Sequence, residues 1–368
     1  MRTVEVTLPA EERGYPVYIG RGSLAELGRI AVEHGFPRRV AVITDEAVAG
    51  LYGHAALESL RREGFAPELL GIPPGEGSKN LDTVRNLYDE LIRREFDRGC
   101  GICALGGGVV GDVAGFVAAT YLRGLPWIQV PTTLLAQVDS SVGGKTGVNH
   151  PAGKNLIGAF WQPEFVLADP EVLATLPPRE LHAGLAEVVK AALIADPALF
   201  SLLEAKWEEL LRGDLDPLEG AIEAACRVKA AVVSRDERER GHRRILNFGH
   251  TIAHALEAAT GYGHFLHGEA VAWGMVGAAW LSWRRGLLDG GDLTRIEMLL
   301  VRLPKPPIPD ILAERFLEHL RHDKKIVAGT LHYVLLRGIG EAIVTEGIGE
   351  GDLLAALEYL RDLQERGP

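Results

Sequence analysis

The stretch Asn247-Phe-Gly-His-Thr-Ile-Ala-His-Ala-Leu-Glu257 organises the chain, because together with His267 it puts three histidines within eighteen positions. His250 and His254 stand at i and i+4, so on a helix they share one face. The glycine-rich connection from Gly261 to His267 can turn back, which would bring His267 to the same place. The sequence therefore predicts a cluster of imidazoles in the second half of the chain.

A carboxylate and an ammonium group precede this cluster on another expected helix. In Ala186-Glu-Val-Val-Lys190, Glu187 and Lys190 share one helix face among apolar neighbours. Two imidazoles and one carboxylate with an open fourth position form a zinc site of the catalytic type. Core-facing histidines are the alternative for any single residue, but three in an apolar, glycine-rich context favour a metal. Spacing alone selects His250 and His254 as the imidazole pair.

Composition and charge narrow the class of protein. The 368 residues suffice for two domains, and 47% hydrophobic with 24% charged residues is typical of a soluble globular chain. No apolar run can span a bilayer and the N-terminus has no signal-peptide pattern, so we expect a cytoplasmic protein. With 39 Lys and Arg against 50 Asp and Glu, the net charge of −11 argues against nucleic acid and anionic membranes as partners.

The cysteines are expected to be inert. Cys100-Gly-Ile-Cys103 spells C-x-x-C, a spacing of redox and metal sites, but it lies in an expected strand. Thiols at i and i+3 of a strand point to opposite faces. We therefore expect buried, unreactive side chains there.

Lysine is scarce, since it supplies nine of the 39 basic residues. In a chain that prefers arginine, a lysine kept in a glycine-rich loop or an apolar helix suggests a need for a compact ammonium with a tunable pKa. Lys145, Lys154, Lys190 and Lys229 are therefore candidates for chemistry, with chance retention as the alternative.

The first half of the chain alternates apolar runs with helical patterns. We expect strands at residues 3–8, 15–19, 39–45, 67–72, 100–105 and 127–130, and helices at 23–34, with Ser23 as N-cap, at 46–63 and from about 81 to 95. This rhythm predicts a mainly parallel sheet covered on both faces. We assign this α/β domain to residues 1–178.

From residue 179 to residue 368 helical patterns dominate and form the second expected domain. The clearest helices cover residues 179–195, 217–234, 246–259, 268–285 and 351–366, with a short hairpin at 331–336 and 342–345. The charged run 235–240 is interpreted as a solvated helix end or loop. The predicted fold class is an N-terminal α/β domain followed by a helix-rich C-terminal domain.

A glycine-rich turn in the first half indicates a nucleotide site. Gly106, Gly108 and Gly111 match G-x-G-x-x-G between an expected strand and a helix, where backbone N–H groups can approach a pyrophosphate. No acid lies about twenty residues further on. Asp45, which ends an earlier strand, or Glu76 in a nearby loop could hold the adenosine ribose. A tight turn without a ligand is the alternative.

Cations gather in glycine-rich segments between the two halves. Lys145 and Lys154 lie among glycines that we interpret as flexible loops suited to an anion. Arg123 and Arg243 add guanidinium groups suited to carboxylate or phosphate. On an acidic chain, this concentration predicts a focused pocket for a polyanionic small molecule.

Taken together, these motifs closely resemble the 3-dehydroquinate synthase family, the sugar-phosphate cyclases of the shikimate pathway. The matching stretches follow the family's order and are residues 74–79, 106–112, 131–133, 138–149, 153–158, 186–190, 243–257, 267–271 and 323–325. The resemblance implies an NAD-binding N-terminal α/β domain, a metal-binding helical C-terminal domain and an active site between them. One departure is His242, where the family pattern has an apolar residue.

The resemblance also implies roles for individual residues. Glu187, His250 and His267 would bind zinc or cobalt, with His254 beside the metal and near the phosphate. Arg123 would reach the site of a neighbouring subunit, so a homodimer is implied. Substrate would be bound by Asp139, Lys145, Lys190, Lys229, Arg243 and Asn247, with Lys154, Asn155 and Lys325 around its phosphate. NAD would be bound by Glu76, Lys79, Gly108, Val109, Val110, Gly111, Asp112, Thr132, Thr133 and Thr175. Beyond the resemblance, Asp45, Gly106, Gly107, Lys145 and Lys154 are further candidates for binding the same cofactor.

The implied reaction converts 3-deoxy-D-arabino-heptulosonate 7-phosphate into 3-dehydroquinate and phosphate, a lyase reaction. It would proceed by transient oxidation with NAD, phosphate elimination, reduction and intramolecular aldol closure. A sister sugar-phosphate cyclase is one alternative, although Arg243 and Asn247 favour a substrate carboxylate that those sugars lack. A metal-dependent polyol dehydrogenase would accumulate NADH. A non-catalytic nucleotide- or metal-binding module would release no phosphate.

Overall fold

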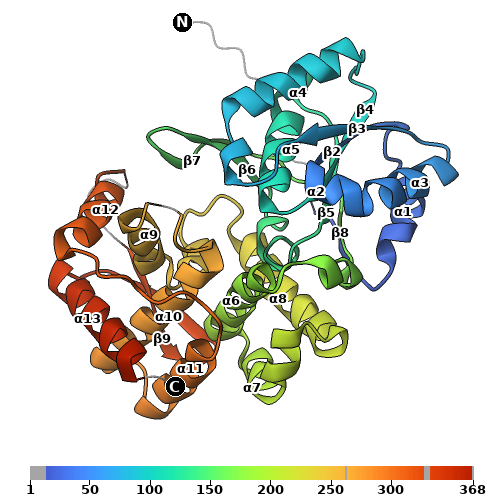
Figure 1. The fold of residues 1–368 in the computed structure, drawn as a ribbon. Coiled ribbons are helices and arrows are strands. Elements are labelled where there is room, and N and C mark those ends of the chain that lie inside the picture. The colour runs from blue at the N-terminus through green and yellow to red at the C-terminus, as the bar shows by residue number, and fades with distance from the viewer. Residues whose placement is uncertain (1–13, 262, 327–331, 367–368) are drawn as a thin grey trace, which may run out of the picture.

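Six parallel strands form the central sheet of the N-terminal half in the computed structural model of the chain (Figure 1). Their order is β1-β8-β5-β4-β2-β3. Their bounds are β1 Val17–Ile19, β2 Arg39–Asp45, β3 Ala66–Ile72, β4 Cys100–Gly106, β5 Trp127–Pro131 and β8 Val166–Ala168. β4 and β5 are buried at every residue, as expected of parallel strands covered on both faces. The predicted mainly parallel sheet is confirmed.

The structure describes residues 14–261, 263–326 and 332–366, without the side chains of residues 319 and 321–326. The strand expected at residues 3–8 lies outside this part of the chain. The helical elements of the N-terminal half are η1 Ser23–Glu26, α1 Leu27–Glu33, α2 Glu46–Val48, η2 Ala49–Gly53, α3 His54–Arg62, η3 Glu76–Ser78, α4 Leu81–Arg93, α5 Gly108–Thr120, η4 Tyr121–Arg123, η5 Ala136–Ser140 and η6 Pro170–Thr175.

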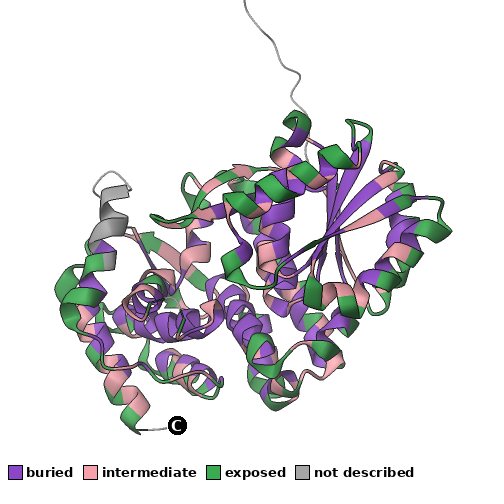
Figure 2. Cartoon of the chain, turned by 45° about the horizontal axis from the view of Figure 1, so that its top comes forward, coloured by how far each residue is buried: buried purple, intermediate pink, exposed green. Residues whose placement is uncertain are grey.

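Two apolar clusters cover the two faces of this sheet, and Figure 2 shows the buried strands between helices that are exposed only on their outer sides. α4 contributes Leu87 to one cluster, and α3 contributes Leu60 to the other. Cys100 belongs to the first and Cys103 to the second, so the two thiols point to opposite faces as predicted. Burial raises the pKa of Cys103 to about 12, which makes it unreactive.

The strand order creates a crevice at one end of the sheet. From β2 the chain crosses to β3 on one side, whereas β4, which also pairs with β2, leads to β5 on the other side. In doubly wound sheets, ligands bind where the direction reverses, beyond the carboxyl ends of the strands. Here those ends are Asp45 and Gly106. The topology explains why the glycine-rich turn follows a late strand.

Helices form most of the C-terminal half. Its elements are α6 Pro178–Ala195, α7 Pro197–Arg212, α8 Leu215–Arg235, η7 His242–Asn247, α9 His250–Ala259, α10 His267–Arg284, α11 Gly290–Val301, α12 Ala313–Ile326, the antiparallel pair β9 Tyr333–Gly338 and β10 Glu341–Thr345, and α13 Glu350–Arg366. The helices and hairpin expected from the sequence are confirmed. α6 and α10 are apolar on nearly all sides and pass through one shared core, as such helices must. Every described helix is too short or too polar to cross a bilayer.

The glycine-rich segments predicted to be flexible loops form a two-stranded antiparallel hairpin instead, so that prediction was wrong. Its strands are β6 Lys145–His150 and β7 Gly153–Phe160, with Gly147 opposite Gly158. A Cβ on Gly158 would lie 2.3 Å from the carbonyl oxygen of Thr146. These glycines therefore serve close backbone approach rather than flexibility.

The predicted N-cap at Ser23 was also wrong. The first helical turn is η1, and its N-cap is Gly22 in the left-handed region, without a side-chain cap of its own. The Asp169 carboxylate instead accepts hydrogen bonds from the backbone N–H groups of Gly22 and Leu24, each at 3.0 Å. A cap supplied from so far along the chain leaves no local sequence signal.

Candidate active site

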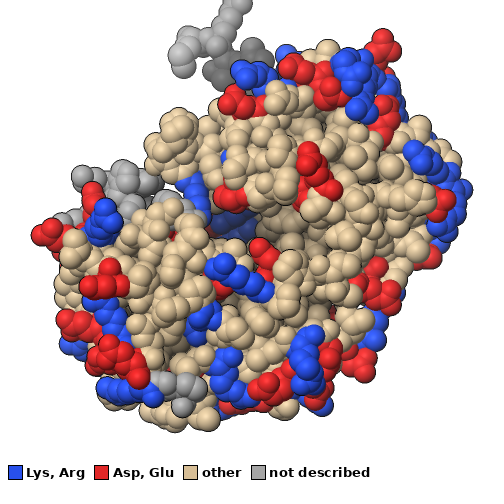
Figure 3. All heavy atoms as spheres, viewed as in Figure 1, with Lys and Arg blue, Asp and Glu red and all other residues tan. Residues whose placement is uncertain are grey.

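A cavity of about 580 Å³ opens between the two halves, and Figure 3 shows the hollow with basic side chains inside it. It is enclosed by the β6–β7 hairpin and η5 on one side and by α6, α8, η7, α9 and α10 on the other. Of the residues predicted from the sequence, it brings together Asp112, Asp139, Lys145, Asn155, Lys190, Lys229, Arg243, Asn247, His250, His254 and His267.

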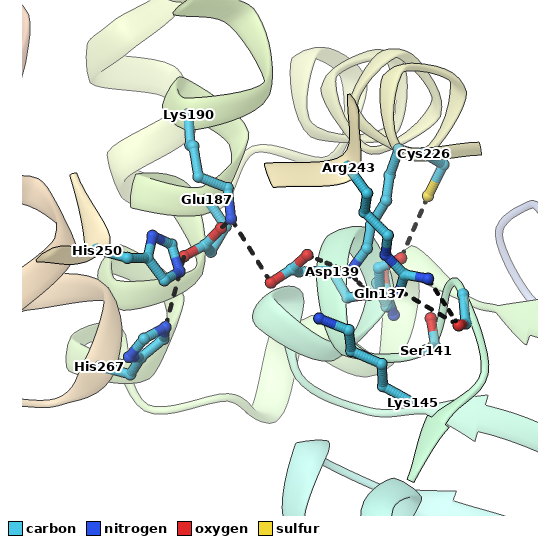
Figure 4. Close-up of polar contacts among 12 residues, drawn as sticks. Gln137, Asp139, Ser141, Lys145, Glu187, Lys190, Cys226, Arg243, His250 and His267 are labelled. Carbon is cyan, nitrogen blue, oxygen red and sulfur yellow. Dashed lines mark hydrogen bonds and ion pairs between the residues drawn. The ribbon is translucent and has the colours of Figure 1, made fainter. Parts of the chain in front are cut away.

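Three side chains from three helices converge at one end of the cavity (Figure 4). Glu187 lies on α6, and His250 and His267 are the first residues of α9 and α10. Glu187 Oε1 is 3.9 Å from His250 Nε2 and 3.8 Å from His267 Nε2. Two donors that are each about 2.1 Å from one ion lie at most about 4.2 Å apart, so these separations suit a single divalent ion.

Glycines allow the helices to meet there. Gly249, at φ 79°, starts α9 and puts His250 in its first position. A Cβ on Gly268 would lie 1.9 Å from the carbonyl oxygen of Ala183. The start of α10 therefore rests directly on the backbone of α6, which carries His267 to Glu187.

His250 and Glu187 have features of metal ligands. His250 Nδ1 lies 3.2 Å from the carbonyl oxygen of Phe248, which can accept its proton and leave Nε2 as the free donor. Burial, followed by the repulsion of Lys190, lowers the pKa of His250 well below its ordinary value, which favours the neutral form. Glu187 is 2% exposed, and although Lys190 pairs with it, neither carboxylate oxygen accepts a well-aligned hydrogen bond from the described residues. A buried carboxylate left in this state fits a metal ligand.

His254 lies beside this group rather than in it. Its ring centroid is 5.5 Å from that of His250 and 6.1 Å from that of His267. The pair selected by helical spacing therefore shares a face, but the Nε2 atoms that face Glu187 belong to His250 and His267. His254 instead forms a second group with Glu257 and His267. The set of Glu187, His250 and His267 comes from helices that are far apart in the sequence, so it is recognised only in the folded structure.

A buried charge cluster lies next to this group. Asp139, on η5, contacts Lys229 and lies 3.8 Å from Lys190. Burial opposes ionisation, but the two ammonium groups hold the pKa of Asp139 far below its usual range. Burial lowers the pKa of Lys229, whereas for Lys190 the nearby carboxylates outweigh burial and raise the pKa. The cluster therefore presents fixed charges to the cavity.

The Glu239 carboxylate, which was not predicted from the sequence, contacts both Lys145 and Asn247. Glu239 pairs with Lys145 and accepts a hydrogen bond from Asn247 Nδ2 over 2.8 Å. Burial acts to raise the pKa of Glu239, but its contacts, chiefly that with Lys145, outweigh burial and lower the pKa. Glu239 belongs to the charged run interpreted as solvated, and nothing local separates it from its acidic neighbours.

Arg243 is buried at the cavity wall with 2% of its surface exposed. Its Nη1 and Nη2 donate to the carbonyl oxygen of Gly143 over 3.3 and 3.2 Å, and its Nε is without a partner among the described residues. The Tyr15 hydroxyl accepts from the N–H of Gly143 over 2.7 Å. Tyr15 and Gly143 were not singled out from the sequence. His242 is exposed, so the departure from the family pattern leaves this packing undisturbed.

The residues expected around a phosphate are partly assembled. Lys154 Nζ lies 3.3 Å from Glu257 Oε1, which ties the hairpin to α9. Asn155 adopts a positive φ of 56° and its N–H donates to Asn149 Oδ1 over 2.9 Å. The side chain of Lys325 lies outside the described residues, and exposed Arg123 does not line the cavity.

At the crevice of the sheet, α5 begins at Gly108 without a side-chain cap from the described residues. A Cβ on Gly106 would lie 2.6 Å from Val110 Cβ, and one on Gly111 would lie 2.9 Å from Gln129 Oε1. These glycines keep the helix close to the sheet and its first N–H groups open, which suits a pyrophosphate.

Other predicted cofactor residues surround this turn. Lys79 forms a buried ion pair with Asp112, and the buried hydroxyl of Thr132 has no partner in the described structure. Two of the predicted residues have structural contacts here. Asp45 Oδ1 accepts from the N–H of Val48 and caps α2, and the Thr175 hydroxyl lies 2.6 Å from that of Tyr52.

The chain is similar to known proteins over almost its whole length. Residues 69–183 match the family model described as 3-dehydroquinate synthase N-terminal, and residues 184–326 match 3-dehydroquinate synthase C-terminal. The 3-dehydroquinate synthase of Desulforamulus reducens is 48% identical over 359 residues, which cover 97% of this chain and 99% of the relative.

Solved structures of related cyclases share the fold. A 2-epi-5-epi-valiolone synthase from Streptomyces hygroscopicus, with NAD+ and Zn2+ bound, superposes with a TM-score of 0.87 at 30% identity, covering 97% of this chain and 99% of that one. A 2-deoxy-scyllo-inosose synthase, complexed with carbaglucose-6-phosphate, NAD+ and Co2+, gives a TM-score of 0.84 at 31% identity, covering 94% and 96%.

Proposed function

The chain belongs to the 3-dehydroquinate synthase family, and we propose that its cleft converts 3-deoxy-D-arabino-heptulosonate 7-phosphate into 3-dehydroquinate and phosphate. The observation that carries the proposal is the convergence of Glu187, His250 and His267 beside a buried cationic cluster. The higher identity to 3-dehydroquinate synthases than to the sister cyclases supports this substrate over theirs.

Two groups that the chain itself cannot supply complete the site. When bound, NAD supplies a reversible hydride acceptor, and a divalent ion, zinc or cobalt, polarises the substrate hydroxyls. The buried Glu187 carboxylate, which accepts no well-aligned hydrogen bond from the described residues, and the two Nε2 donors fit the ion. The open N-terminus of α5 and the unpartnered Thr132 hydroxyl fit the dinucleotide.

The chain's own residues bind and orient the substrate. Arg243 and Asn247, which both line the cavity, bind its carboxylate. Lys145 adds a further positive charge there once it exchanges Glu239 for the substrate. When the substrate binds, its carboxylate replaces the Glu239 carboxylate beside Lys145. The cations therefore keep a negatively charged partner throughout.

The other end of the substrate carries the phosphate. Lys154, Asn155 and His254 surround it, with Lys325 from α12 as a further cation. The charges of Asp139, Lys190 and Lys229 hold the substrate's hydroxyls between the two ends. Fixed charges of this kind need no reorganisation during the reaction, which is how a protein lowers a barrier by positioning.

The domain division follows from the same proposal. Residues 1–178 bind NAD and residues 179–368 bind the metal and most of the substrate, so the boundary falls at the start of α6. The cleft then lies between a nucleotide-binding sheet and a metal-binding helical core.

A coupled assay tests the function and is the first prediction. With NAD and Zn2+, the protein should release one phosphate per carbocycle formed from the heptulosonate phosphate, without net NADH. Removing the metal with a chelator should lower turnover by at least about 1000-fold, because the site loses its Lewis acid, and added Zn2+ should restore it. Accumulating NADH would instead identify a polyol dehydrogenase. Phosphate release only from sugars without a carboxylate would identify a sister cyclase.

A further inference from the structure

Glu257 is a buried carboxylate to which the proposed reaction gives no role. It lies two turns after His250 on α9, and only 5% of its side chain is exposed. A carboxylate is costly to bury unless it is paired. Its partners should therefore explain why the position is acidic.

The two oxygens of Glu257 face two different elements. Oε2 lies 3.6 Å from His267 Nδ1 at the start of α10, and Oε1 lies 3.3 Å from Lys154 Nζ on the β7 strand. One carboxylate thus joins the proposed metal ligand to the hairpin of the N-terminal half.

Glu257 Oε2 lies just beyond hydrogen-bond distance of His267 Nδ1, and its negative charge favours the tautomer that is protonated there. A proton on Nδ1 that points to Glu257 leaves the Nε2 lone pair directed at Glu187, 3.8 Å away. For His250 the equivalent acceptor is the carbonyl oxygen of Phe248. A carboxylate holds the ring more strongly than a carbonyl and makes its other nitrogen a better donor.

We propose that Glu257 is a positioning residue of the metal centre, which fixes the tautomer and orientation of His267 and tethers the β6–β7 hairpin to it through Lys154. The proposal rests on the proposed function only in that His267 holds a divalent ion. Glu257 touches neither substrate nor metal.

A second metal site is the competing interpretation, because His254, Glu257 and His267 also lie within metal-binding distance of one another. Two facts oppose it. The ammonium of Lys154 already lies beside the Glu257 carboxylate. An ion at Nδ1 of His267, with another at Nε2, would also require the ring to lose both protons. Binding of two metal equivalents per chain would overturn the proposal.

Metal affinity provides the test, since it is measured without turnover. The metal-free wild type, E257Q and E297Q are titrated with Zn2+ against a competing chelator. Glu297 is the matched control, because it accepts a hydrogen bond from the Tyr359 hydroxyl and does not line the cavity. We expect one equivalent bound by each protein, with equal affinity for wild type and E297Q and an affinity about 10- to 100-fold weaker for E257Q. The visible spectrum of bound Co2+ should change in E257Q alone.

A further variant, E257D, separates contact from charge and folding. E257D keeps the negative charge but moves it away from His267 by one methylene, so this variant should also bind Zn2+ more weakly than the wild type. If E257Q does not fold, E257D takes its place in the test. Affinity within about two-fold of wild type in the folded variant would overturn the proposal. A wild type that binds no metal would instead refute the proposed function.

The tether has its own readout. K154M and E257Q should both speed amide hydrogen exchange in the β6–β7 hairpin, because each removes one end of the same ion pair. A hairpin that exchanges in K154M as slowly as in the wild type would refute the tether.

Discussion

Gly143 lies between the Tyr15 hydroxyl, to which its N–H donates, and the Arg243 guanidinium, from which its carbonyl oxygen accepts. Its φ of 105° is one that L side chains rarely adopt. A Cβ there would lie 2.4 Å from Arg243 Nη2. Because the guanidinium fills the space that a side chain would need, this glycine sets the place of Arg243, the cation that we propose binds the substrate carboxylate.

We predict that G143A lowers kcat/KM for the heptulosonate phosphate by about 10- to 100-fold, mainly through KM, as expected for a displaced charged hydrogen-bond donor. The matched control is G35A, since Gly35 has a φ of 62° but nothing within 4 Å of its Cβ position. G35A should lose about 1 to 2 kcal/mol of stability in urea unfolding from backbone strain, and G143A should lose more, because its Cβ also meets Arg243. Equal kinetics for the two would contradict the assigned role.

Single residues differ in how far the sequence reveals them. Lys190 and Lys229 stand out because a lysine in an apolar helix is conspicuous, and both line the cavity. Glu239 and Glu257 do not stand out, because one lies in a charged run and the other lies near the end of an ordinary helix. Their importance comes from partners brought to them by folding, Lys145 for the first and His267 for the second. The sequence holds no trace of such pairs.

At the scale of elements, the connection between α8 and η7 is folded around one carboxylate. Asp236 accepts hydrogen bonds from the backbone N–H groups of Arg240, Gly241 and Arg243, over 2.9, 2.8 and 3.0 Å. These bonds, that of Arg240 first, lower the pKa of Asp236 to about 2. The loop therefore delivers Arg243 to the cavity wall in a defined position.

The lowered pKa of Asp236 predicts that the free energy of unfolding depends on pH. Because the pKa of Asp236 is lower in the folded chain, its contribution is complete above the unfolded value of about 4 and is lost as the pH falls through about 2. D236N should therefore be less stable than the wild type at pH 6, and the gap should have begun to narrow at pH 3. Urea unfolding at both values measures it. A constant gap in D236N would contradict the argument.

The elements that periodicity could predict are the long ones. α6, α10 and the buried strand β4 have continuous apolar patterns, and each was expected. β8 was not, since it has only three residues and is defined by pairing with β1 and β5. The β6–β7 hairpin was missed because glycines that permit close strands look like glycines that permit disorder.

In the molecule as a whole, one of the predicted cations, Arg123, lies outside the cleft of its own chain. Arg123 is exposed on η4, where it and Leu122 both adopt positive φ values, 70° and 51°. Backbone strain of this kind outside glycine is retained where function requires it. We therefore propose a homodimer in which Arg123 enters the cleft of the partner subunit.

Subunit mixing tests this assembly directly. R123A and H250A should each be nearly inactive as homodimers, the first from loss of a cation and the second from loss of a metal ligand. In a mixed dimer, the R123A subunit keeps its own metal ligands and receives Arg123 from its H250A partner, so one of the two sites is complete. Random exchange of equal amounts makes about half the dimers mixed, so activity should recover to about a quarter of wild type. If Arg123 served its own chain, or if the protein sedimented as a monomer, mixing would restore nothing. The recovery therefore reports both the dimer and the side from which the guanidinium arrives.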